Sequence, residues 1–183
     1  SCGFCKILSM KEDSSGPLPH LLRPEVHWSR ATGYLKLGMF KQARAELSGL
    51  PNELPWSKQK KSMLLEIFQG LKNWKEMQKI AYELRMEFPQ ESGWWVMDAY
   101  ATRRSLSIEQ ARGILLEALV HNYDDALIRY NLACYACQLG SPGECLDFLK
   151  EAVKRDERYK AMALADEDLK GVQAALREMG WSE

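Results

Sequence analysis

The chain has 183 residues, of which 46% are hydrophobic, and this is enough for one folded unit with a sizeable core. Basic and acidic residues number 25 each, so the net charge is zero and no overall field attracts nucleic acid or anionic lipid. The longest apolar runs are broken by charge well short of the roughly 20 residues that a membrane span needs. We therefore expect neither nucleic acid nor a membrane as a partner.

Residues 1–23 differ from the rest of the chain. Serine, proline and glycine interrupt them, and the stretch KEDSSGPLP is typical of a linker. We expect this segment to be linker-like or partly disordered. It carries no secretory signal pattern, and the cysteines of the chain lack the spacing of a small disulfide scaffold, so we expect a cytoplasmic location.

A period of 34 residues runs through the chain after this segment. The segments that begin at residues 38, 72, 106 and 140 align without gaps. Two positions of the alignment, four residues apart, are apolar in every copy, as expected for one face of a helix. They hold Ala43, Met77, Ala111 and Cys145, and then Leu47, Ala81, Leu115 and Leu149.

This pattern resembles the tetratricopeptide repeat. A small residue in a first helix is followed by an aromatic one, such as Tyr34 or Phe68, then by a turn glycine, Gly38 or Gly140, and by a second helix with the A-x3-apolar pattern. The resemblance implies an all-α fold, a right-handed α-solenoid of helical hairpins in which stacked neighbours form a continuous core. The predicted units are 24–57, 58–91, 92–125 and 126–159.

An array of this kind needs a cap, and residues 160–183 are expected to supply a C-terminal capping helix. Asp166 is the predicted N-cap of a helix over 166–180, and Gly180 follows its end. The sequence ALADEDL also resembles the closing helix of bacterial tetratricopeptide proteins. Within the third unit, Asp98 stands where an apolar residue is usual, and this predicts locally looser packing.

In the tetratricopeptide family, which the chain resembles, the first helices line a concave groove. The resemblance implies that a protein or peptide partner binds there. Arginine can bind a carboxylate through two hydrogen bonds, and aromatic rings offer flat apolar area. A partner segment with acidic and aromatic groups would therefore suit the groove face. The alternative is that the arginines form a solvated face and the tyrosines only pack. Helical spacing assigns the following residues to the groove: Trp28, Thr32, Lys36, Gln59, Glu66, Tyr100, Arg103, Arg104, Tyr130, Cys134, Cys137 and Gln138.

Two neighbouring tryptophans receive different interpretations. Trp95 matches the tryptophan position of the repeat, so we expect it in the core. Trp94 points about 100° away from it on the helix and is the better candidate for an interface.

The function most consistent with these features is a non-enzymatic protein–protein interaction module or scaffold, present as a monomer or weak homo-oligomer. A chaperone-like binder of a secreted or assembling substrate is an alternative. Domains that hold acidic chaperone tails use a clamp of lysine, asparagine and arginine, and the matching positions lack it: Trp28, Thr32, Met63, Gly93 and Met97.

Catalytic and metal chemistry find little support in the sequence. The three histidines, His20, His27 and His121, do not stand beside a nucleophile, and no phosphate-binding loop is present. We expect no enzymatic activity, no cofactor and no metal. Two CxxC pairs, at residues 2–5 and 134–137, keep a thiol or metal-binding protein open as a further alternative. For the second pair, helical spacing is the favoured explanation.

Overall fold

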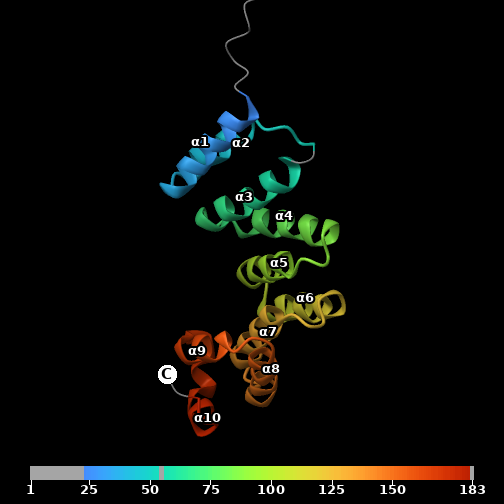
Figure 1. Ribbon diagram of the computed structural model, residues 1–183, viewed down its shortest axis with the longest axis vertical. Helices are drawn as coiled ribbons and strands as arrows, with labels where there is room; N and C mark the ends of the chain where they lie inside the picture. Colours follow the sequence, from blue (N-terminus) through green and yellow to red (C-terminus); the bar gives the residue numbers. More distant parts are fainter. Residues whose placement is uncertain (1–22, 54–55, 182–183) are drawn as a thin grey trace, which may run out of the picture.

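The computed structural model describes residues 23–53 and 56–181, and the regular structure in these ranges is helical (Figure 1). Consecutive helices pack on one another and stack along the long axis of the molecule. The four successive pairs are α1 (Pro24–Lys36) with α2 (Phe40–Leu47), α3 (Trp56–Gly70) with α4 (Trp74–Glu87), α5 (Ser92–Ser105) with α6 (Ile108–His121), and α7 (Ala126–Gln138) with α8 (Pro142–Arg155).

Turn geometry follows the sequence period in three of the four pairs, and Leu106, at the equivalent position between α5 and α6, departs from it with φ of −130°. Gly38 and Gly140 have φ of 69° and 74°, and Lys72 holds the equivalent position between α3 and α4 with φ of 54°. Only glycine adopts this left-handed conformation without a steric cost, so Lys72 carries local strain of about 1 kcal/mol. Asn73 and Ser107, also one period apart, then cap α4 and α6 by accepting hydrogen bonds from backbone N–H groups.

The periodic apolar positions form the core of the stack. The second helices contribute Ala43, Met77, Ala111 and Cys145, which are all fully buried. A second periodic position, on the first helices, holds the fully buried Ala31, Ala99 and Ala133 of α1, α5 and α7. Where the side chain is alanine, neighbouring helices can approach closely. A glycine has the same use at the end of α3, because a Cβ on Gly70 would lie 2.2 Å from Cζ of Phe40 on α2.

The sequence position of Asp98 predicted looser packing in the third pair, and the structure does not show it. The Asp98 side chain is buried, and Nε of Arg85 on α4 donates a hydrogen bond of 2.6 Å to its Oδ2. Thr102 donates a second bond to Oδ1, at 3.3 Å. The Arg85 guanidinium also lies over the Trp95 ring, 4.5 Å from its centroid. A charge pair between α4 and α5 therefore replaces the usual apolar contact.

The cap differs from the single helix that was expected over 166–180. It consists of α9 (Arg158–Ala165), the 3₁₀ helix η1 (Glu167–Val172) and α10 (Gln173–Glu178). Asp166 does act as an N-cap, accepting a 2.9 Å bond from the backbone N–H of Asp168. Gly171 interrupts the run, since glycine weakens an α-helix, and a Cβ there would lie 3.2 Å from Sγ of Cys137. The tighter 3₁₀ geometry thus accompanies a close approach of η1 to α7.

Along the described part of the chain, no helix combines the length and the apolar character that crossing a membrane requires.

Candidate functional site

A pocket of about 640 Å³ opens on the first helices at the N-terminal end of the stack. Its walls come from α1, α3 and the beginning of α5, so it lies on the face that the repeat pattern assigned to the groove. Five of the predicted groove residues line it: Trp28, Thr32, Lys36, Gln59 and Glu66. Sequence reasoning did not place Lys58, Met63 or Trp94 there, although it singled out Trp94 as an interface candidate.

The aromatic wall of this pocket is held in place by its neighbours. The Trp28 ring packs on Trp56, with centroids 6.1 Å apart, and Thr32 donates a 2.9 Å bond to the Trp28 carbonyl oxygen. Trp94 donates its indole N–H to Glu91 at 2.9 Å. Both indoles are only partly buried, so each keeps apolar area open to a guest.

Two cations reach the pocket from its rim. Lys58 is neutralised by Glu91, with a 2.6 Å contact, and this hydrogen bond lowers the pKa of the Glu91 carboxyl. Lys36 is exposed, and within residues 23–53 and 56–181 no carboxylate pairs with it. Glu66 is likewise exposed on the lining. The pocket therefore combines a mainly apolar wall with an exposed charge of each sign, Lys36 and Glu66.

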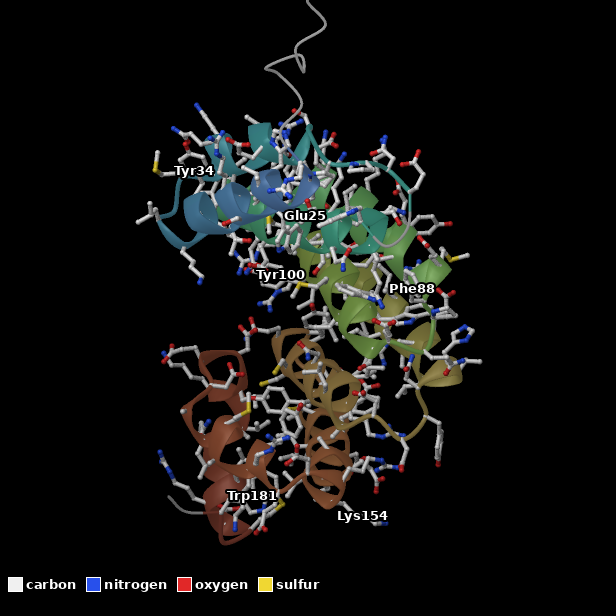
Figure 2. All side chains as sticks on the ribbon, turned by 45° about the horizontal axis from the view of Figure 1, so that its top comes forward. Glu25, Tyr34, Phe88, Tyr100, Lys154 and Trp181 are labelled. Carbon is white, nitrogen blue, oxygen red and sulfur yellow. The ribbon has the colours of Figure 1, made fainter. Side chains whose placement is uncertain are left out.

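Further along the stack, Arg104 lies in an aromatic cluster with Trp74 and Tyr100. Its guanidinium carbon is 4.8 Å from the Tyr100 ring centroid and 5.4 Å from that of Trp74, while the two rings meet edge to face at 5.8 Å. Arg104 is exposed. Tyr100 lies on the side of the stack where Trp181 and the cap are found, and Phe88 on the other side (Figure 2). These cation–π contacts orient the arginine without neutralising it.

Arg103 and Gln138 bind the chain's own cap. Arg103 holds Asp168 in a bidentate pair, with N–O distances of 2.6 Å and 3.1 Å, and this hydrogen bonding raises the pKa of Arg103. Gln138 donates to the backbone oxygen of Asp168 at 2.9 Å. Neither side chain is the free groove contact that the helical spacing suggested.

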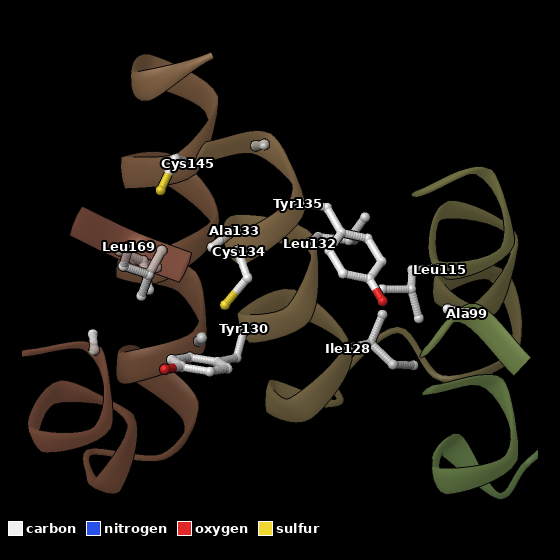
Figure 3. Close-up of a cluster of buried hydrophobic side chains, with 14 of the residues drawn as sticks. Ala99, Leu115, Ile128, Tyr130, Leu132, Ala133, Cys134, Tyr135, Cys145 and Leu169 are labelled. Atoms are coloured by element: carbon white, nitrogen blue, oxygen red, sulfur yellow. The ribbon is translucent and has the colours of Figure 1, made fainter. Parts of the chain in front are cut away.

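Tyr130 and Cys134 are covered by the same segment. Each is only 5% exposed, and the Tyr130 hydroxyl donates a 2.7 Å hydrogen bond to Asp166. Both side chains point toward Leu169, away from Ile128 and Tyr135, which face α5 and α6 (Figure 3). Cys137, half-buried, lies against Gly171. The spacing argument assigned these residues to the groove face, but residues more than 25 positions downstream cover that face of α7.

The described cysteines, Cys134, Cys137 and Cys145, are free thiols. Burial, followed by the nearby charge of Asp166, raises the pKa of Cys134 far above its usual range, and burial beside Cys137 raises the pKa of Cys145 to about 12. Within the described ranges, no three metal-binding side chains converge on one point. The pair at residues 2–5 lies outside the described residues.

This burial predicts unequal thiol reactivity. Cys134 and Cys145 should react with iodoacetamide at pH 8 at least about tenfold more slowly in the native protein than in urea, because the thiolate is the nucleophile and is scarce at both sites. Residue-level mass spectrometry of alkylated peptides measures each cysteine separately. Equal rates in native and unfolded protein would show that the two thiols are not protected.

The described histidines have structural partners. His27 lies 2.7 Å from a carboxylate oxygen of Glu46, and His121 stacks on Trp95 with ring centroids 5.3 Å apart. Trp95 is 1% exposed, as its position in the repeat predicted. His20 lies outside the described residues.

Comparison with solved structures addresses the fold directly. A structure of MamA, described as MamA MSR-1 C2, superposes with a TM-score of 0.59 at 18% sequence identity, covering 75% of this chain and 79% of that chain. MamA is a TPR-like protein, and the helices of this chain form hairpins. The chain has the helical-repeat fold of this TPR-like protein. No protein family and no curated protein matches the sequence significantly. The structural similarity to MamA and the packing of consecutive helices confirm the helical-repeat solenoid that the 34-residue period predicted.

Proposed function

We propose that this tetratricopeptide-fold chain is a non-enzymatic interaction module that holds a peptide segment of a partner protein in the pocket on α1, α3 and α5. The observation that carries the proposal is the pocket itself, open and lined from three first helices by Trp28, Met63 and Trp94 with polar groups around them. Tryptophans in such partly desolvated positions are the residues that most often dominate binding energy.

The size and chemistry of the pocket support a peptide guest. A volume of about 640 Å³ falls within the range of 300–1,000 Å³ that is usual for ligand sites, and it has room for a few side chains. Its polar groups are an amide, two hydroxyls and charges of both signs, which suit hydrogen bonding to a backbone. They do not form a nucleophile with an adjacent base, as acyl or phosphoryl transfer would require.

Replacing Trp28 with alanine tests this assignment. Peptides selected from a random displayed library on the full chain should lose at least about tenfold in affinity for the Trp28→Ala variant, because the indole is one of two tryptophan side chains that line the pocket. Isothermal titration of the selected peptides measures the change. Val120→Ala, which removes an exposed apolar side chain of α6 away from the pocket, is the matched control and should leave the affinity unchanged.

Two results would contradict the proposal. One is equal binding of the selected peptides to Trp28→Ala and to the native chain, when circular dichroism shows both to be folded. The other is protection from hydrogen exchange on binding that falls on α6 or α8 and leaves α1 and α3 unchanged.

A further inference from the structure

The chain's own cap shows how the groove face of a first helix can hold an acidic segment. Residues 166–169 read Asp-Glu-Asp-Leu and lie against α7. Asp166 accepts from the Tyr130 hydroxyl and Asp168 forms a bidentate pair with Arg103. Leu169 is fully buried beside them. The arrangement consists of two carboxylates, two residues apart, followed by an apolar anchor.

Gln138 and Tyr130, two of the side chains that hold this segment, have basic or aromatic counterparts in the earlier units, whereas the positions equivalent to Arg103 hold Gln69 and Leu35. One period of 34 residues separates Gln138 from Arg104, and two further periods lead to Lys36. Tyr130 corresponds in the same way to Trp28, three periods earlier. Because each unit repeats the same geometry, these residues lie on the same face of their helices. The cap lies against α7 and α8 and reaches α5 through the pair of Asp168 with Arg103. Lys36 of α1 and Arg104 of α5 remain exposed.

The open part of the groove is better supplied with cations than the covered part. Gln138 of α7 is replaced by Arg104 in α5 and by Lys36 in α1, and both cations are exposed. Among the described residues neither has a carboxylate partner, whereas Arg103 has Asp168. Arg104 is already oriented by Trp74 and Tyr100, so less side-chain entropy is lost when it binds a carboxylate.

We propose that the open groove binds an acidic segment of a partner protein, with carboxylates on Lys36 and Arg104 and an apolar side chain in the pocket beside Trp28. This inference rests on the proposed function and names the chemistry of the guest. The cap segment is its internal template, with Asp-x-Asp-apolar as the simplest pattern. Glu66 opposes an acidic guest on the pocket lining, so the segment places its apolar residue there and its acids toward the two cations.

A labelled peptide provides the test. Fluorescein-LADEDLKGV, which has the sequence of residues 164–172, is titrated with the full chain in low salt while fluorescence anisotropy is recorded. We expect saturable binding that weakens as salt is added, since the contacts are exposed ion pairs. The combined variant Lys36→Gln and Arg104→Gln should weaken it at least about tenfold. A peptide with Asp166→Asn and Asp168→Asn should lose a similar factor.

A charge-matched control isolates the groove. Lys79→Gln with Lys150→Gln removes two exposed lysines from α4 and α8 and should leave the affinity unchanged. Equal weakening by both double variants would overturn the proposal, because the peptide would then respond to net charge alone. Increased hydrogen exchange in η1 and α10 on peptide addition would also overturn it, because the peptide would then be replacing the chain's own cap.

Failure of this inference is distinguishable from failure of the proposed function. If the acidic peptide does not bind, but neutral peptides from the displayed library bind and respond to Trp28→Ala, the pocket remains a peptide site and only the acidic guest is wrong. If neither kind of peptide responds to Trp28→Ala, both are wrong.

Discussion

Arg85→Ala is expected to lower the free energy of unfolding by about 3–5 kcal/mol, as is typical when one partner of a buried ion pair is removed. The substitution leaves the Asp98 carboxylate, which is 1% exposed, without its 2.6 Å partner. It also removes the planar group that packs on Trp95. Urea unfolding followed by circular dichroism measures the loss.

The pH dependence of this variant has a definite sign. Burial already raises the pKa of Asp98 from its ordinary value of 3.8, and Arg85 opposes that rise. Without Arg85 the native state binds the proton still more tightly than the unfolded chain does. Protonation of Asp98 therefore stabilises the folded state of the variant. This stabilisation is complete when the pH is below the pKa of Asp98 in the unfolded chain, and it is lost as the pH rises through the higher pKa of Asp98 in the folded chain. The cost of Arg85→Ala should therefore be smallest at about pH 4 and grow toward neutrality.

Two controls separate the buried charge from the loss of packing. Arg85→Met combined with Asp98→Leu removes both charges and keeps apolar volume, so it should recover most of the stability. Arg112→Ala breaks a more exposed pair with Glu144 and should cost about 1 kcal/mol or less. If Arg85→Ala costs no more than Arg112→Ala, the pair between α4 and α5 does not contribute as we expect.

Leu169→Ala is expected to destabilise the C-terminal end of the stack by about 2–5 kcal/mol, through lost apolar burial and the cavity left behind. Leu169 is fully buried in the cluster that η1 shares with α7 and α8 (Figure 3). Each unit of a repeat array contacts mainly its neighbours, so the loss should be local. Hydrogen exchange should rise in α7, α8 and α10 and change little in α1 and α2.

Alkylation provides an independent measure of the same change. Loosening of η1 uncovers Cys134, whose Sγ lies 3.7 Å from Asp166, so its reaction with iodoacetamide should accelerate. Met162→Ala, at a half-exposed position of α9, is the control and should have little effect on either measurement. A uniform rise in exchange over all helices would contradict the local character of the cap.

The helical pairs could be predicted because they depend on spacing. A period of 34 with apolar residues four positions apart places Met77 and Ala81 on one face of a helix, and only a stacked neighbour can cover that face. Both are fully buried in the structure. Asp98 breaks the pattern, and its partner could not be read from the period, because a buried charge needs a specific opposite charge from another helix.

The candidate site was predictable only on its N-terminal side. Trp28, Thr32 and Lys36 line an open pocket on the face that their spacing indicated. Tyr130 and Cys134 share that face and lie under the cap. The spacing argument treats all units as equal, and the cap lies on one end of the array only.

The sequence by itself determined which residues of each helix face its neighbours, since helix geometry and the 34-residue period are local properties of the chain. It also indicated that Asp166 begins a capping element, because an N-cap is a local hydrogen bond. Only the tertiary structure decided that the cap turns through a 3₁₀ helix onto α7, that Arg103 pairs with Asp168, 65 residues away, and that the groove stays open beside Trp28. Those outcomes depend on contacts between distant segments, whose free energies follow from shape and charge complementarity in three dimensions.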